Sequence, residues 1–226
     1  MHVVAGVLRD RRGRVLLAER PAGKHLAGGW EFPGGKLHAG ESRLAGLRRE
    51  LEEELGIDRV AAHPLIRIAH RYPDRHVLLD VWAVTRYRGD PEGRDGQALR
   101  WCAVEALEAA GLLPADRPVV TALRLPLRIA ATRTAGYRID PWPGPRGARL
   151  RGAACPDARA ARRAAAGGAD FLVLDARLAP RSLRALCDSV GIPVFARGLA
   201  LARARALGAS GVNAIQRSGG AASSSG

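Results

Sequence analysis

Apolar and polar residues alternate through the first half of the chain with the spacing of strands and short helices. An apolar run over 2–9, a polar stretch over 10–13 and a second apolar run over 14–19 predict two strands joined by a hairpin turn. Further runs predict strands over 65–69, 77–85 and 99–104 and helices over 105–110 and 117–125. This mixture predicts an α/β fold, with a mixed sheet and helices packed on it.

One amphipathic helix is predicted between Ser42 and Gly56. Leucines recur inside this segment at three- and four-residue spacing, which places them on one face of a helix. Ser42 is a residue type that caps the start of a helix, and Gly56 is the type that ends one in a left-handed turn. Both ends of the helix are therefore predicted from the sequence.

The pattern stops between residues 130 and 148, where the Pro-rich stretch 141–145 cannot sustain a helix or a central strand. Beyond it, strands are predicted at 148–153, 170–175, 192–196 and 211–216, and helices at 157–166, 181–190 and 199–207. Such alternation predicts a parallel sheet. We expect a first domain over 1–128, a Pro- and Gly-rich linker over 129–147, a partial β/α barrel-like unit over 148–217 and a disordered tail over 218–226.

The net charge of +14 is carried mainly by the second half of the chain. Residues 1–128 hold 21 Lys and Arg against 17 Asp and Glu, whereas residues 129–226 hold 15 against 5. Aromatic residues do not alternate with the arginines, as a surface that stacks bases would require. We therefore expect a solvated Arg-rich surface and no nucleic-acid partner.

The cysteines and the hydropathy exclude other classes of protein. Three cysteines lie far apart without a Cys-x-x-Cys pair, which argues against a disulfide framework and against a zinc site. No stretch approaches the ~18 apolar residues of a membrane span, and the first residues lack the pattern of a secretion signal. We expect a soluble, cytoplasmic protein that acts as a monomer.

Three carboxylates gather on one face of the helix predicted between Ser42 and Gly56. At about 100° per residue, Glu50, Glu53 and Glu54 fall within one arc of the helix. Like charges packed this closely repel one another unless a cation neutralises them, and oxygen-only ligands favour Mg²⁺ or Mn²⁺. The alternative is a solvated acidic face without a metal.

The spacing of the whole segment 35–57 decides between these alternatives. It runs Gly, five residues, Glu, seven residues, Arg-Glu-Leu, one residue, Glu-Glu, one residue and Gly-Ile. With so many constrained positions, chance agreement is well below about one in a million. The segment resembles the Nudix box, and that resemblance implies that Glu41 helps to fix the loop before the helix.

The resemblance also implies roles for the other residues of the box. Glu50, Glu53 and Glu54 would bind metal ions that bridge a diphosphate. The carbonyl of Gly34 would be a further metal ligand, and Arg49 would orient a carboxylate. Either Glu50 or Glu53 would act as the catalytic base.

The likeness covers about residues 2–127 and is strongest to the MutT-type 8-oxo-dGTP diphosphatases. The stretch 30–36 resembles the segment that enters the box in that family, and the resemblance implies substrate contacts for Gly35 and Lys36. Arg20 stands where the family keeps an arginine that contacts phosphate.

Three more positions resemble substrate or metal positions of that family. Arg75 corresponds to an arginine that lies against the base. Asp95 stands where a metal-binding Glu is expected, and Asp116 stands where a base-recognising Asn is expected. Ionised Asp only accepts hydrogen bonds, whereas Asn also donates. A protonated Asp116, with its pKa raised by burial, would still donate.

The second half resembles, over short stretches, the C-terminal part of thiamine phosphate synthases and their TenI-type relatives. These stretches are 168–174, 192–196 and 208–215. A closed eight-unit barrel needs about 200 residues or more, so this half cannot close one alone. Arg197 and Gly198 replace the paired glycines of that family's phosphate loop, so we expect a non-catalytic remnant.

The Nudix resemblance implies a hydrolase dependent on Mg²⁺ or Mn²⁺ whose substrate is a nucleoside triphosphate. The expected reaction converts 8-oxo-dGTP to 8-oxo-dGMP and pyrophosphate, which would clear oxidised nucleotides before DNA replication. Two alternatives stay open. One is hydrolysis of another nucleoside diphosphate-X compound, and the other is a non-catalytic module whose Arg-rich half binds nucleic acid or another anion.

Overall fold

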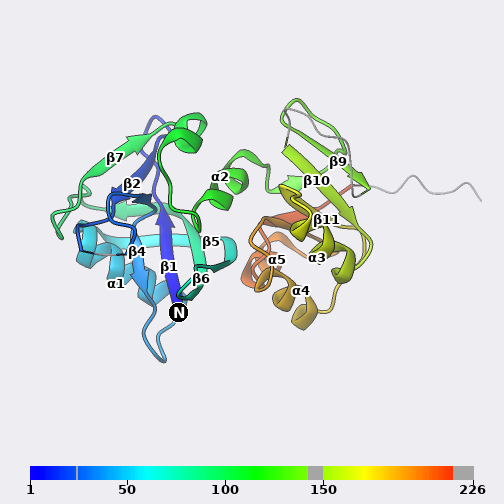
Figure 1. Cartoon of the computed structure of the whole chain (residues 1–226), viewed down its shortest axis with the longest axis horizontal. Coiled ribbons are helices and arrows are strands. Elements are labelled where there is room, and N and C mark those ends of the chain that lie inside the picture. Colours follow the sequence, from blue (N-terminus) through cyan, green and yellow to red (C-terminus); the bar gives the residue numbers. More distant parts are fainter. Residues whose placement is uncertain (24, 142–149, 216–226) are drawn as a thin grey trace, which may run out of the picture.

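The computed structural model describes residues 1–23, 25–141 and 150–215. It consists of two units that lie next to each other, joined through the segment after the helix α2 (Figure 1). The tail expected over 218–226 lies outside the described residues. None of the helices in the described part of the chain has the length and apolarity needed to cross a membrane.

The first unit is built on two small sheets. Its elements are β1 (His2–Val7), β2 (Val15–Glu19), β3 (Trp30–Glu31), β4 (Gly34–Lys36), α1 (Arg43–Leu55), β5 (Asp58–Arg71), β6 (His76–Arg88), β7 (Leu99–Cys102), the 3₁₀ helix η1 (Val104–Ala109) and α2 (Arg117–Arg124). One sheet has the order β4-β1-β6-β5 and the other β3-β2-β7. Because β1 pairs parallel with β6 and antiparallel with β4, the larger sheet is mixed, which confirms the predicted α/β fold.

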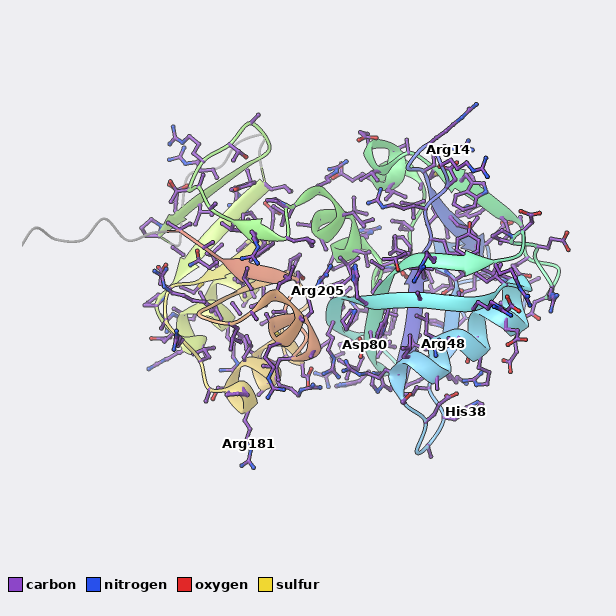
Figure 2. All side chains as sticks on the ribbon, turned by 180° about the vertical axis from the view of Figure 1, so that it is seen from behind. Arg14, His38, Arg48, Asp80, Arg181 and Arg205 are labelled. Atoms are coloured by element: carbon purple, nitrogen blue, oxygen red, sulfur yellow. The ribbon has the colours of Figure 1, made fainter. Side chains whose placement is uncertain are left out.

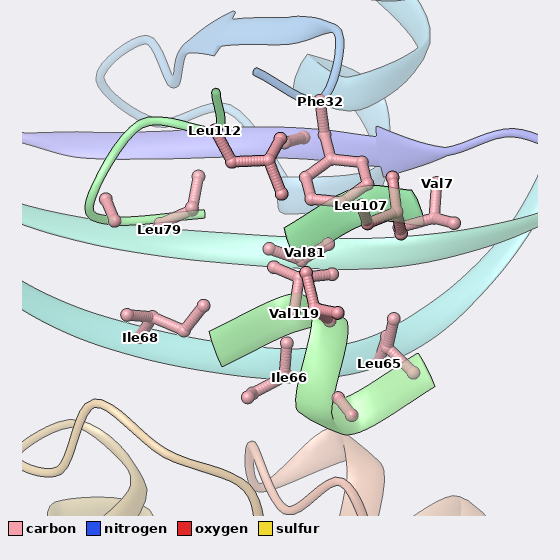
Figure 3. Close-up of a cluster of buried hydrophobic side chains, with 14 of the residues drawn as sticks. Val7, Phe32, Leu65, Ile66, Ile68, Leu79, Val81, Leu107, Leu112 and Val119 are labelled. Carbon is pink, nitrogen blue, oxygen red and sulfur yellow. The ribbon is translucent and has the colours of Figure 1, made fainter. Parts of the chain in front are cut away.

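The two faces of the larger sheet carry separate hydrophobic clusters. On one face, Ile66 and Val81 pack with Leu107 of η1 and Val119 of α2 (Figure 3). On the other face lie the leucines of α1, among them Leu47, which is fully buried. Burying such a side chain stabilises the fold by about 1.5–3 kcal/mol. The sheet thus holds α1 by its apolar face and leaves the carboxylate face open to the site.

Both predicted ends of α1 are confirmed. The Ser42 Oγ accepts a hydrogen bond from the Ala45 amide at 3.2 Å, and Gly56 has a φ of 72°. Its amide donates to the carbonyl of Glu52. Fixed ends matter here because they set the position of every carboxylate along the helix.

The second unit is a parallel sheet with helices between its strands. Its elements are β8 (Arg128–Ile129), β9 (Tyr137–Pro141), β10 (Leu150–Cys155), α3 (Ala158–Ala166), β11 (Phe171–Leu174), α4 (Pro180–Cys187), β12 (Val194–Arg197), α5 (Leu201–Ala206) and β13 (Gly211–Asn213). The six strands have the order β8-β13-β12-β11-β10-β9, and every neighbouring pair is parallel. The prediction of a parallel, half-barrel-like unit is confirmed.

The segment 129–147, expected to be a linker, contributes strands to this sheet. β8 pairs with β13, and β9 pairs with β10, so these two short strands form its edges. Pro141 is the last residue of β9, and proline is tolerated in an edge strand such as this one. The sequence pattern did not predict β8 because its partner lies at the other end of the unit.

The second unit packs beside β5, the edge strand of the larger sheet. The helices α4 and α5 contact β5, whose neighbour within the sheet is β6. The approach is close at two glycines. A Cβ added at Gly191 would lie 3.2 Å from the Ala69 carbonyl oxygen, and one added at Gly208 would lie 2.8 Å from the Arg67 Cδ. Covering an edge strand in this way protects it from pairing with other chains.

We expect Gly191→Ala to destabilise the protein relative to Gly136→Ala. An added methyl group at Gly191 presses on the backbone of β5, whereas one at Gly136 meets nothing within 4 Å. Both changes reduce the entropy of the unfolded chain equally, so their difference isolates the contact, which should cost about 1 kcal/mol. Urea unfolding measures this difference, and equal free energies of unfolding would contradict the close packing of the two units.

Candidate active site

The guanidinium of Arg49 connects the loop before α1 to the carboxylates of the helix. Its Nε and Nη2 donate to the two carboxylate oxygens of Glu41, each at 3.1 Å. Its Nη1 donates to Glu50 at 2.9 Å and to Glu53 at 3.0 Å. The Nη2 also donates to the carbonyl of Lys36 at 3.0 Å. One guanidinium therefore bonds to three carboxylates, in the forked geometry that Arg offers, and its single positive charge reduces their mutual repulsion.

This pairing fixes the charges of both partners. The hydrogen bond from Arg49, followed by one from the amide of His38, lowers the pKa of Glu41. The bonds to Glu41, and then those to Glu50, raise the pKa of Arg49. Arg49 and Glu41 are therefore both charged at neutral pH.

Glu50 and Glu53 share this arginine but differ in exposure. Glu50 is only 9% exposed, and its carboxylate lies against the backbone of Gly35. A Cβ at Gly35 would lie 2.2 Å from the Glu50 Oε2, so a larger residue does not fit there. The side chain of Glu53 is 57% exposed. Glu50 is thus held in place, while Glu53 is accessible to a ligand.

Glu54 faces a cleft at the other end of the site. The amide of Gly34 donates to the Glu54 Oε2 at 3.1 Å, and the Gln97 side chain donates to the Glu54 carbonyl at 3.0 Å. The amide of Asp95 donates to the Gln97 Oε1 at 2.8 Å, so Gln97 fixes this loop on the end of α1. The acidic residues that line the cleft are Glu19, Glu31, Glu54 and Asp95. The fold therefore brings Asp95 to the same cleft as Glu54.

The expected metal ligands all offer oxygen atoms, but their side chains do not converge on one point in this structure. Within the described part of the chain, no three His, Cys, Asp or Glu side chains lie close enough together to hold a metal ion. Glu50 and Glu53 bond to Arg49, and Glu54 bonds to the amide of Gly34. Their donor atoms are all oxygens, which suits a hard cation such as Mg²⁺. A metal at this site stays a prediction.

A second cleft adjoins the first and has largely apolar walls. Its apolar lining comes from Val3, Leu26, Val77, Leu79, Leu113 and Ala115. Arg20, Arg75 and Asp116 also line it, so three of the expected substrate-binding residues surround one cleft. Glu31 lines both clefts. Lys36 is exposed and lines neither of them.

The two arginines of this cleft are held differently. Arg20 forms an ion pair with Glu31 at 2.5 Å and donates to the carbonyl of His25 at 2.6 Å. Arg75 pairs with Asp74 at 2.5 Å in the turn between β5 and β6. Arg20 is therefore fixed to the wall of the cleft, whereas Arg75 belongs to an exposed turn.

Asp116 places a buried carboxyl group in the wall of this cleft. It is 4% exposed, and although it occupies the N-cap position of α2, its side chain caps no helix amide. Its Oδ1 accepts a long hydrogen bond, 3.5 Å, from the amide of Phe32. Burial, followed by the charge of Glu31, raises the pKa of Asp116 well above its usual value. The carboxyl group therefore favours its neutral form, which both donates and accepts.

Glu31 and Tyr72 belong to the site, although no role was predicted for either of them from the sequence. The hydroxyl of Tyr72 accepts a hydrogen bond from the Ala115 amide at 3.4 Å, and its ring lines the apolar cleft. Glu31 lies within the stretch 30–36 that resembles the MutT-type family, and Tyr72 lies three residues before Arg75. Their orientation toward the clefts depends on pairing between distant strands, which a single sequence does not specify.

The comparison with known families decides the identity of the first unit. The model of the NUDIX domain family matches residues 4–122, more than half of the chain. The chain belongs to the Nudix family. It is therefore a Nudix hydrolase whose box occupies the β4 to α1 segment, and the resemblance stated from the sequence is confirmed for the first half. The resemblance of the second half to thiamine phosphate synthases stays a prediction.

The first half of this chain matches individual Nudix relatives over nearly the whole length of those relatives. The 8-oxo-dGTP diphosphatase of Escherichia coli (strain K12) is 34% identical over 124 residues, which cover 55% of this chain and 96% of that protein. The CTP pyrophosphohydrolase of the same strain is 38% identical over 122 residues, covering 54% and 90%. The solved structure of a MutT NUDIX hydrolase from Burkholderia pseudomallei is 29% identical, covers 54% of this chain and 96% of that chain, and has a TM-score of 0.50.

We expect Asp116→Asn to change the pH dependence of stability of this Nudix hydrolase. Because the folded pKa of Asp116 lies above its value of about 3.8 in an unfolded chain, the folded protein binds a proton that the unfolded chain releases. The parent should therefore lose stability relative to the variant as the pH rises from about 4 toward the raised pKa. Urea unfolding at several pH values measures this. An exposed control, Asp90→Asn, should track the parent, and parallel curves for the parent and Asp116→Asn would mean that Asp116 is ionised in the fold.

Proposed function

We propose that this Nudix hydrolase converts 8-oxo-dGTP to 8-oxo-dGMP and pyrophosphate and so removes oxidised nucleotides before DNA replication. The observation that carries the proposal is the meeting of two clefts at Glu31. The acidic cleft, with Glu54 and Asp95, suits a metal-bound triphosphate, and the apolar cleft beside Asp116 suits a base. The name of the Escherichia coli relative, 8-oxo-dGTP diphosphatase, supports this substrate.

Attack of water on the β-phosphorus accounts for the proposed products. The water oxygen forms a bond to the β-phosphorus, and the bond from this phosphorus to the oxygen that bridges to the α-phosphate breaks. The nucleoside monophosphate leaves with the bridging oxygen, and pyrophosphate carries the water oxygen. Glu50 or Glu53 takes the proton of the water, and Arg49, bonded to both, positions them.

The carboxylates of α1 are the proposed holders of a divalent cation. Glu50, Glu53 and Glu54 would bind Mg²⁺ or Mn²⁺, with Asp95 and the carbonyl of Gly34 as further ligands. When bound, such an ion neutralises phosphate charge and lowers the pKa of a coordinated water. The oxygen-only donor set supports this choice of metal.

Four other residues are proposed to contact the substrate. Arg20, fixed by Glu31 at the junction of the clefts, would contact a phosphate. Gly35 and Lys36, in the segment that enters α1, would contact the triphosphate through backbone and side chain. Arg75 lines the apolar cleft and would lie against the base.

Asp116 is proposed to recognise the base in its neutral form. A neutral carboxyl group donates one hydrogen bond and accepts another. Guanine presents two acceptors, N7 and O6, along one edge. Oxidation at C8 turns N7 into an N–H donor, so 8-oxoguanine presents one donor beside one acceptor. The neutral Asp116 matches that edge and leaves one guanine acceptor unpaired.

A second candidate substrate is CTP. The CTP pyrophosphohydrolase of Escherichia coli is 38% identical to this chain. Cytosine presents its N4 amino group as a donor beside the N3 acceptor, which a neutral Asp116 would also match. The ratio of kcat/KM for 8-oxo-dGTP and CTP separates the two candidates.

The second unit is proposed to be a non-catalytic remnant of a thiamine phosphate synthase-like domain. Its parallel sheet agrees with such an origin. At Gly198, where a phosphate loop would need open backbone, an added Cβ would lie 2.2 Å from the Nε of Arg177. The arginine side chain thus occupies space that a phosphate would need.

We expect Glu53→Gln to lower turnover at least ~100-fold with little change in stability, because it removes a ligand charge and keeps the size of the side chain. The matched control is Glu52→Gln, an exposed residue on the far side of the same helix. Steady-state rates at saturating Mg²⁺ and thermal unfolding measure the two effects. Equal turnover of both variants would contradict the proposed carboxylate site.

We expect Asp116→Leu to lower the ratio of kcat/KM for 8-oxo-dGTP over dGTP by about tenfold or more, because it leaves polar atoms of the base unpaired. Asp116→Asn keeps one donor and one acceptor and should retain most of the preference. Rates on both nucleotides for the two variants measure this. A ratio in Asp116→Leu equal to that of the parent would place Asp116 outside base recognition.

A further inference from the structure

A row of alternating charges runs from the second unit to the start of α1. Asp188, the C-cap residue of α4, lies 2.8 Å from the Nη1 of Arg67 in β5. The Nε of Arg67 lies 3.5 Å from the Oδ2 of Asp80 in β6. Arg43, the first residue of α1, donates to this same oxygen at 2.8 Å. The row therefore ends on the helix that carries the carboxylates of the Nudix box.

The middle of this row is shielded from water. Arg67 is 5% exposed and Asp80, labelled in Figure 2, is fully buried. Both contacts of Arg67 are close without the alignment of a hydrogen bond, so they rest on charge. Charges interact more strongly in such an environment than at a surface, and removing one member of a buried pair costs more than removing a surface partner.

The two units approach closely around Arg67. The stem of Arg67 lies against Gly208, where an added Cβ would come within 2.8 Å of its Cδ. Arg205 of α5, labelled in Figure 2 where the units meet, is also buried there. Asp80 and Arg67 are direct cross-strand partners on β6 and β5. Because the stem of Arg67 is tightly packed, its side chain has little space to move if the charge of Asp188 is removed. Such a change therefore affects the interaction of Arg67 with Asp80.

Asp188 occupies a position that the helix itself disfavours. The last carbonyl groups of a helix carry partial negative charge, so an acidic residue at the C-terminus lowers helix stability. The ion pair with Arg67 offsets this cost. The position of this carboxylate is thus explained by the first unit and not by α4.

We propose that Asp188 is a positioning residue for hydrolysis, which acts through Arg67 and Asp80 on Arg43 and so fixes the first turn of α1. The inference rests on the proposed function only in that α1 carries the catalytic groups. The row holds two aspartates and two arginines, so their negative and positive charges are equal in number. Without the Asp188 charge, Arg67 and Arg43 compete for one carboxylate and repel each other. The start of α1 then shifts, and displacements of about 1 Å at a site are enough to slow a reaction.

The test compares Asp188→Asn with Asp140→Asn in the full chain. Asp140 also pairs with an arginine, Arg138, at 2.6 Å, but on the edge strand β9. Hydrogen exchange of the amides over 45–48 should become threefold faster or more in Asp188→Asn. Its kcat should fall roughly 3- to 10-fold with KM changed less than about twofold. The Asp140→Asn control should match the parent in both measurements.

A double variant tests whether the effect passes through Arg67. Asp188→Asn added to Arg67→Met should speed exchange over 45–48 no further than Arg67→Met alone. Additive effects would overturn the proposal, and so would equal exchange and kcat in Asp188→Asn and Asp140→Asn. Faster exchange confined to α4 would also overturn it, because Asp188 would then act only within its own unit. Exchange needs no nucleotide, so an error in the proposed substrate would leave this test intact.

Discussion

The crowding of carboxylates on one face of α1 determines how this helix and the loop before it are held together. Glu50, Glu53 and Glu54 project from two turns of helix, and Glu41 approaches from the loop before it. Arg49 makes this possible because its fork binds three of these groups at once. The capped ends of α1 then fix where each carboxylate lies. The carboxylate of Glu50 packs against Gly35, and that of Glu54 accepts a hydrogen bond from the amide of Gly34. These two contacts fix the helix relative to the loop before it.

At Asp116, in the apolar cleft, burial favours an uncharged carboxyl group, in contrast to the charged groups around α1. In the loop before α1, the hydrogen bond from Arg49 lowers the pKa of Glu41 and keeps it ionised, whereas at Asp116 the loss of water and the charge of Glu31 raise the pKa and favour the neutral acid. The same chemical group can therefore serve phosphate chemistry in one cleft and base recognition in the next. Glu31 faces both clefts and is paired with Arg20, so it links the two environments.

Local features of this fold could be predicted from the sequence, and features that depend on distant partners could not. The helix α1, its caps and its carboxylate face follow from spacing within 22 residues of one another, from Gly35 to Ile57. The strands β8 and β9 were missed because each gains its hydrogen bonds only within the assembled second sheet. Asp116 was recognised as a departure from the family, but its raised pKa depends on burial and on the charge of Glu31, which only the fold brings to it. The link from Asp188 to Arg67 is equally invisible in a sequence.

The path of the water oxygen during turnover shows which phosphorus atom the water attacks. The full chain would be incubated with 8-oxo-dGTP and Mg²⁺ in water enriched in oxygen-18, and the products would be weighed by mass spectrometry. We expect equal amounts of 8-oxo-dGMP and pyrophosphate, with the heavy oxygen in the pyrophosphate. Release of orthophosphate, heavy oxygen in the nucleotide, or no turnover by the folded protein would contradict it.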